Sequence, residues 1–140
     1  MTESDTVIAQ IHCIKTVYEF FHCLDDRTHD QIVELFPAHG VWDRNGEMLE
    51  GRAAIANALA NRPADRRTFH AVCNPLVELT QSNRATVHFY LTVYEAKKDM
   101  SVRSAPIVPS AVRRCTDSLV FDGSRWLIER KSSSRHLPFA

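Results

Sequence analysis

The sequence lacks an excess of charge of either sign. Lysine plus arginine and aspartate plus glutamate both number 17, so the net charge is zero when histidine is neutral. A chain without a net field does not attract nucleic acid or an anionic membrane surface over long range. We therefore expect neither of these partners, and a small, fairly neutral ligand instead.

Long apolar runs are also missing. No stretch approaches the roughly 18 to 20 apolar residues that a membrane span needs. The start, MTESDTVIAQ, has neither the basic nor the apolar region of a signal peptide. The cysteines, Cys13, Cys23, Cys73 and Cys115, are therefore expected to be reduced thiols in a cytoplasm.

The chain has 140 residues, which fit one domain spanning residues 1–140 and leave no room for a second cofactor domain. Apolar residues recur every three or four positions in residues 6–24, which predicts an amphipathic helix. A shorter helix is predicted in THDQIVELF, with Thr28 as its N-cap. A third is predicted in GRAAIANALANR, residues 51–62.

The remaining patterns indicate strands. Asn45 and Gly46 suit the tight turn of a short hairpin. The segment 97–110, which contains two prolines, is expected to be a mobile loop. Helices first and strands later indicate an α+β fold, in which the helices pack on one face of a strongly curved, mainly antiparallel sheet. The long strands are predicted in residues 70–79, 84–96, 110–121 and 125–133.

Several segments, in this order, resemble one family. They are a first helix ending in LD, then ELF, GVW, NGEMLEGRAAI, RTFHAVCNPLVEL and DGSRWLIER. Over residues 10–132 the sequence resembles the SnoaL-like branch of the nuclear transport factor 2-like superfamily, which includes scytalone dehydratase, bile acid dehydratase, ketosteroid isomerase and hexachlorocyclohexane dehydrochlorinase. The resemblance implies a cone-shaped α+β barrel.

The resemblance also implies a pair of catalytic residues, Asp25 and His70. In relatives of this type the aspartate orients the imidazole, and the other ring nitrogen takes a proton from the substrate. Such a pair needs neither a metal nor an organic cofactor, and a carboxylate stabilises the imidazolium that forms. The plainer alternatives are a buried histidine bonded to the backbone and a solvated acid near a helix end, although an acid there opposes the helix dipole.

A pocket is expected around this pair. Phe20 stands where several dehydratase relatives carry tyrosine or lysine, so an electrophilic partner is missing or is supplied elsewhere. Asn74 has the strand parity of His70 and is expected to reach the pocket if Pro75 introduces no bulge. The expected pocket residues are Tyr18, Phe20, Phe21, Trp42, Val72, Asn74, Phe89 and Cys115.

Other chemistries fit the spacing poorly. His70 and Cys73, three residues apart on a strand, point to opposite faces and cannot form a nucleophile and base pair. The pairs His12–Cys13 and His22–Cys23 are misaligned on a helix, so no metal site is expected.

Strand parity also predicts the roles of several other side chains. In residues 85–93 the odd-numbered residues are expected to face the cone, and the even-numbered residues 86–94 to form an outer face for a homodimer or, alternatively, a solvated face. Asp117 and Arg130 are expected to form an ion pair across the last hairpin. Trp126 is expected in the core, and for Trp42 the core is the commoner role.

The expected function is a cofactor-free lyase, dehydratase-like, or an isomerase that acts on a small cyclic or polyketide-like substrate. Two alternatives remain open. One is a non-catalytic small subunit of a ring-hydroxylating dioxygenase, which predicts a trimer and a partner chain. The other is a ligand-binding module that uses the same pocket without chemistry.

Overall fold

The first helix begins with a capping box and presents one apolar side to the sheet. The computed structural model describes residues 1–98 and 106–139, so half of the predicted loop 97–110, residues 99–105, lies outside the described residues. Helix α1 spans Glu3–Asp26, and the Thr2 hydroxyl accepts a hydrogen bond from the Asp5 backbone N–H. The predicted helix is confirmed, but the apolar residues Val7, Ile8 and Ile11 near its start are exposed. The side chains that α1 buries still lie three or four residues apart: Ala9, Cys13, Thr16, Val17, Phe20, Phe21, Cys23 and Leu24.

A short helix, a hairpin and a third helix follow. Helix α2 is His29–Val33, strand β1 is Val41–Arg44, β2 is Glu47–Glu50 and helix α3 is Arg52–Ala60. The predicted turn is confirmed, because Asn45 and Gly46 have φ angles of 55° and 98°. Thr28 is the N-cap of α2, but its hydroxyl donates to the Cys23 carbonyl of α1 and caps no N–H of α2.

Four long strands complete the chain; three extend beyond their predicted C-terminal ends, and the strand predicted in residues 110–121 spans 111–121. They are β3 (Arg66–Gln81), β4 (Arg84–Lys97), β5 (Ala111–Phe121) and β6 (Trp126–Leu137). The sheet order is β2-β1-β6-β5-β4-β3, and every neighbouring pair is antiparallel except β1 with β6, which is parallel. The predicted α+β class and the mainly antiparallel sheet are confirmed.

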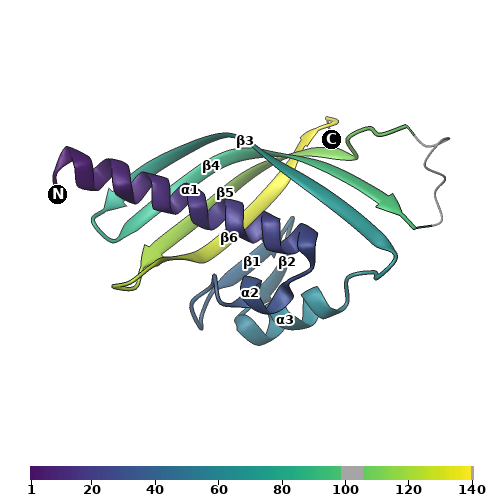
Figure 1. Ribbon diagram of the computed structural model, residues 1–140, viewed down its shortest axis with the longest axis horizontal. Coiled ribbons are helices and arrows are strands. Elements are labelled where there is room, and N and C mark those ends of the chain that lie inside the picture. The colour runs from purple at the N-terminus through teal and green to yellow at the C-terminus, as the bar shows by residue number, and fades with distance from the viewer. Residues whose placement is uncertain (99–105, 140) are drawn as a thin grey trace.

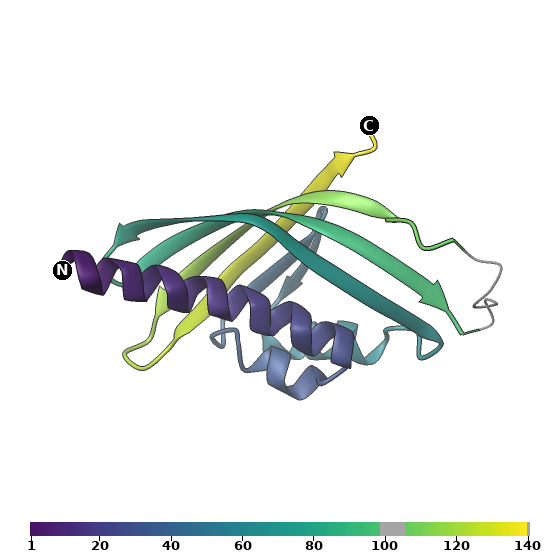
Figure 2. The same cartoon turned by 45° about the horizontal axis from the view of Figure 1, so that its top comes forward.

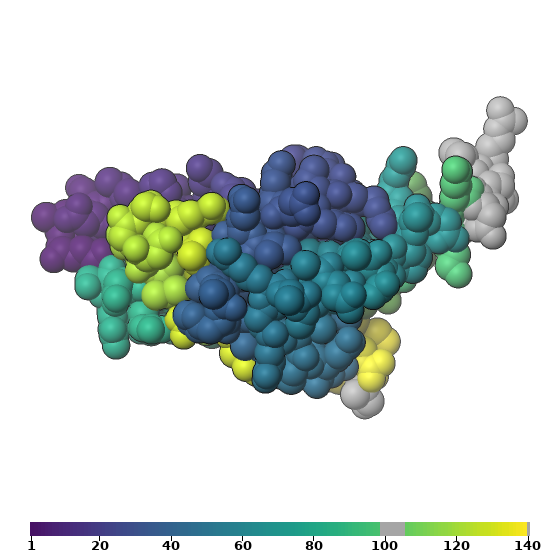
Figure 3. All heavy atoms as spheres, turned by 90° about the horizontal axis from the view of Figure 1, so that it is seen from below, coloured from purple at the N-terminus to yellow at the C-terminus, as the bar shows by residue number. Residues whose placement is uncertain are grey.

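The sheet is arched, and the helices lie on its concave side. Figure 1 shows α1 running obliquely across the long strands, with α2, α3 and the short hairpin below it. The view in Figure 2 shows the arch of the sheet above α1. Seen from below, α1 in purple and the segments around α2 and α3 in blue and teal cover this side of the molecule (Figure 3). The core therefore lies between helices and sheet, as in the predicted cone.

The predicted alternation in β4 is confirmed. Ala85, Val87, Phe89 and Leu91 are buried, whereas the even-numbered side chains between them are only half buried. A homodimer through this outer face stays a prediction. Both tryptophans, Trp42 and Trp126, are buried in the core. In the described residues no helix is both long and apolar enough to cross a membrane.

A bulge in β3 corrects the expected place of Asn74. Cys73 pairs with Tyr90 and Leu76 with His88, so Asn74 and Pro75 together stand opposite Phe89 alone. Proline has no N–H for the ladder and is found at such bulges. Asn74 adopts a φ of 52° and is exposed, so its amide lies outside the core and outside the pocket described below.

A second bulge corrects the expected ion pair of the last hairpin. Ser118 pairs with Arg130 and Leu119 with Ile128, so Glu129 is an extra residue on β6. The extra residue reverses which side chains face inward, and Lys131 enters the core in place of Arg130. Asp117 pairs with Lys131 at 2.6 Å, whereas Arg130 pairs with Asp43 at 3.2 Å.

Because Asn74 is in the left-handed region, we predict opposite outcomes for two replacements there. Asn74→Gly should leave the free energy of unfolding unchanged or slightly raised, whereas Asn74→Val should lower it by about 1–2 kcal/mol. Urea denaturation measures both. Glu78→Val, at an exposed position of ordinary strand conformation in β3, is the matched control and should cost nothing. Equal stability of Asn74→Val and wild type would contradict the bulge.

Candidate active site at the end of the first helix

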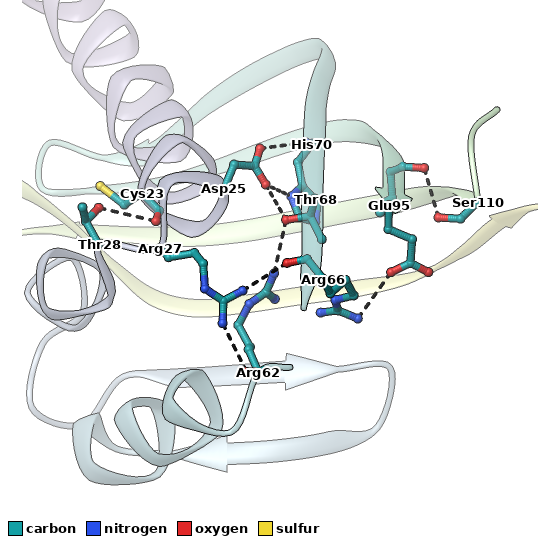
Figure 4. A network of polar contacts seen from close by, with 11 residues as sticks. Cys23, Asp25, Arg27, Thr28, Arg62, Arg66, Thr68, His70, Glu95 and Ser110 are labelled. Atoms are coloured by element: carbon teal, nitrogen blue, oxygen red, sulfur yellow. Dashed lines mark hydrogen bonds and ion pairs between the residues drawn. The ribbon is translucent and has the colours of Figure 1, made fainter. Parts of the chain in front are cut away.

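The carboxylate of Asp25, in the last turn of α1, accepts three hydrogen bonds from β3. Its Oδ1 lies 2.6 Å from His70 Nδ1 and accepts from the Thr68 hydroxyl at 2.8 Å. Its Oδ2 accepts from the His70 backbone N–H at 2.9 Å. The two strand residues reach one carboxylate because residues two apart on a strand point to the same side (Figure 4).

These bonds determine the charge of Asp25. Burial by itself would raise its pKa, but the hydrogen bonds from the His70 ring and backbone outweigh it, so the pKa is lowered from 3.8. The carboxylate is therefore ionised at neutral pH and can only accept hydrogen bonds. It follows that Nδ1 of His70 carries the proton of the shared bond, and that Nε2 of a neutral ring has a free lone pair.

Arginine side chains hold the helix end against the start of β3. Arg27 has a φ of 61° and ends α1, and its guanidinium donates to the carbonyls of Arg62 and Arg66. Arg62 donates to the Thr68 hydroxyl at 3.2 Å (Figure 4). Burial and the charges of Arg66 and Arg27 lower the pKa of Arg62 to about 10, so it remains charged. Thr68 thus accepts from a cation and donates to the carboxylate.

A pocket of about 880 Å³ lies beside this pair and surrounds the outer side of α1 near its C-terminal end. Its apolar lining includes Phe21 of α1 and Phe69 and Val72 of β3. Most of its polar lining comes from α1, and Gln31, Glu34 and Arg125 also contribute. His70 and Asp25 both line it. No residue that the structure describes hydrogen-bonds Nε2 of His70, so this nitrogen is available to a molecule in the pocket.

Apart from Asn74, the predicted pocket residues fall into two groups. Tyr18, Phe21 and Val72 line the pocket, with Tyr18 about half exposed. Four others do not line it and instead lie buried in the interior of the cone, near the buried side chains of Lys131 and Asp117: Phe20, Trp42, Phe89 and Cys115. Burial raises the pKa of the Cys115 thiol to about 12, so this sulfur is not a thiolate nucleophile at neutral pH.

Sequence reasoning missed Thr68, Arg62 and Lys131. Thr68 could have been found, because it lies two residues before His70 on the same strand and therefore points to the same side. Lys131 could not, because its burial depends on the bulge at Glu129.

Cys73 contacts the Thr92 hydroxyl and the Ala71 carbonyl. Within residues 1–98 and 106–139 no three His, Cys, Asp or Glu side chains gather in a way that could hold a metal ion.

The comparisons with known proteins identify the family. The sequence profile of the SnoaL-like domain matches residues 7–132, and the chain belongs to this family. The sequence has no match among curated proteins.

Several solved structures share the fold of this chain. An NTF2-like protein with a cystatin-like fold from Novosphingobium aromaticivorans superposes with a TM-score of 0.82 at 16% identity, over 96% of this chain and 86% of that one. A putative scytalone dehydratase from the same organism gives 0.79 at 13% identity, over 97% and 89%. A Catenulispora acidiphila protein in complex with S-DNPA gives 0.74 at 17% identity, over 89% and 91%. At these identities the likeness shows the fold.

We predict that Asp25→Asn changes the acid dependence of stability. The pKa of Asp25 is lower in the folded protein than in the unfolded chain. The carboxylate therefore stabilises the fold fully above pH 3.8, and this contribution is lost as the pH falls through the pKa of the folded state. The free energy of unfolding of the variant should be about 1–3 kcal/mol below that of wild type at neutral pH, because charge-assisted hydrogen bonds are lost. The difference should shrink as the pH falls below 3.8.

Chemical denaturation across this pH range measures the effect. Asp26→Asn is the matched control, because Asp26 is the next residue along the chain and pairs only with the exposed His22. The free energy of unfolding of Asp26→Asn should change with pH as that of the wild-type protein does. A constant offset between Asp25→Asn and wild type at every pH would contradict the assignment of charge to Asp25.

Proposed function

We propose that this protein is a cofactor-free lyase, dehydratase-like, or an isomerase that acts on a small cyclic or polyketide-like substrate. The observation that carries the proposal is the pair itself: an ionised carboxylate holds Nδ1 of His70, and the ring lines a pocket with Nε2 free. A general base needs both a lone pair that faces the substrate and a partner that stabilises the cation it becomes.

In the proposed reaction Nε2 of His70 removes a proton from a carbon next to a carbonyl group. The electron pair of the broken C–H bond moves into an enolate, and Asp25 stabilises the imidazolium. In elimination, the enolate expels a hydroxyl group from the β-carbon, and the imidazolium returns its proton so that water leaves. In isomerisation of an unsaturated ketone, the proton returns to a different carbon. Both outcomes share the first step.

The family and the neighbouring structures support this class of reaction. The chain is a SnoaL-like domain, and one structural neighbour bears the name of a putative dehydratase. The fold also serves to hold organic molecules, as the complex with S-DNPA indicates for that neighbour. This second observation favours one alternative function, a ligand-binding module that uses the pocket without chemistry.

The shared first step is the one to measure. With 2-tetralone, a bicyclic ketone, as the probe in deuterated buffer, the protein should accelerate exchange of the protons next to the carbonyl group, followed by NMR. We predict that His70→Gln, which removes the base and keeps a polar side chain, lowers the catalysed rate by about 10²–10⁴-fold.

Two controls sharpen this measurement. His39→Gln removes an exposed histidine between α2 and β1 and should leave the exchange rate unchanged. Circular dichroism should be the same for all three proteins. If His70→Gln exchanges protons as fast as the wild-type protein, His70 is not the base. If the wild-type protein binds the ketone but does not accelerate exchange, the ligand-binding module is favoured.

A further inference from the structure

The cone interior contains a buried ion pair that the proposed reaction does not yet use. Lys131 Nζ lies 2.6 Å from Asp117 Oδ2, and the two side chains are 4% and 0% exposed. The second carboxylate oxygen of Asp117, Oδ1, is buried without a hydrogen-bond partner. Burial raises the pKa of Asp117, against the opposing effect of Lys131.

Such a pair is an unfavourable way to fill a core. Moving each charge from water into the core costs roughly several kcal/mol of folding free energy. Apolar residues of similar volume often stabilise a core at least as well as a buried ion pair does. The unpaired Oδ1 adds a further cost. Stability alone therefore does not account for Lys131 and Asp117, and charged groups kept in an apolar interior are typical of functional sites.

Aromatic rings surround the ammonium group. Nζ of Lys131 lies 4.3 Å from the ring centroid of Phe20, 4.6 Å from that of Phe21 and 5.4 Å from that of Phe89. An ammonium has three N–H donors, and Asp117 takes one of them. Among residues 1–98 and 106–139 no other acceptor bonds the ammonium, and the rings attract it only by cation–π interaction, which is weaker than a hydrogen bond to a charged oxygen. An oxygen atom that reached the ammonium would therefore accept a stronger interaction than the rings provide.

Phe21 connects this interior to the candidate active site. Its ring centroid lies 5.3 Å from that of His70 and 4.6 Å from Lys131 Nζ. It also lines the outer pocket. One aromatic ring is therefore close to both the base and the ammonium. If the Phe21 side chain turned aside, a substrate ring in its place would be close to both groups.

We propose that the Lys131 ammonium binds the carbonyl or enolate oxygen of a cyclic substrate, which reaches it from the pocket at His70 after the Phe21 side chain turns aside. The inference rests on the proposed function, because it names the group that stabilises the oxygen when His70 removes the proton. The N–H of Lys131 donates a hydrogen bond to the oxygen that gains negative charge, and Asp117 keeps the amine protonated. Lys131 then supplies the electrophilic partner that Phe20 does not.

The test uses 4-nitrophenolate, an aromatic oxyanion that resembles an enolate and whose absorbance reports binding. The variant Lys131→Met/Asp117→Val removes the pair without changing net charge. Binding should weaken by about tenfold to a hundredfold, the range expected for one charge-assisted hydrogen bond. The matched control, Arg84→Met/Glu129→Val, removes an exposed ion pair between β4 and β6 and should bind as wild type does.

Equal affinity of wild type and the Lys131/Asp117 variant would overturn the inference, as would the absence of nitrophenolate binding by wild type. If the double variant does not fold, Phe21→Leu decides: a smaller side chain should speed association several-fold, and an unchanged rate would overturn the inference. The proposed function fails separately, since loss of nitrophenolate binding leaves proton exchange by His70 as an independent measurement.

Discussion

The hydrogen bonds that Asp25 accepts from β3 are the interaction on which the site depends. The carboxylate stands in the last turn of α1, where the helix dipole disfavours negative charge. Three donors from Thr68 and His70 offset that disadvantage and join the helix end to β3, the edge strand. The backbone N–H of His70 is among them, so the position of the strand and the orientation of the ring are determined by one group.

The same arrangement separates two chemical environments. The carboxylate and imidazole line an open pocket, together with polar side chains that come mostly from α1. The Lys131–Asp117 pair lies deeper, among Phe20, Phe21 and Phe89. A base that exchanges protons needs contact with substrate and solvent, whereas an ammonium that stabilises an oxyanion acts most strongly where water is excluded. Phe21 is the boundary between the two.

The sequence predicted the parts of this structure that depend on local periodicity. The three- and four-residue spacing predicted helix α1, and the alternation in β4 placed its buried side chains correctly, because each pattern repeats within one element. In α1 the buried face was not predicted correctly, since Val7, Ile8 and Ile11 are exposed. The contact of Asp25 with His70 came from the family resemblance, since two residues 45 positions apart leave no local signal.

Two of the failures, at Asn74 and Arg130, share one cause. Asn74 and Arg130 were placed by strand parity, and each lies at or just beyond a bulge that interrupts it. A bulge depends on how two strands pair, which is not visible in a single strand, although Pro75 marked one of them. Phe20, Trp42, Phe89 and Cys115 were correctly placed inside the cone, but side chains packed around Lys131 close that interior.

The protonation of the His70 ring tests the account most directly. Nitrogen-15 NMR of the ring, at a pH where it is neutral, distinguishes the two tautomers. The structure requires the proton on Nδ1 and a lone pair on Nε2, with the Nδ1 proton shifted downfield by its bond to Asp25. Asp25→Asn should yield a mixture of tautomers. A ring protonated on Nε2 in the wild-type protein would contradict the account, because no lone pair would then face the pocket.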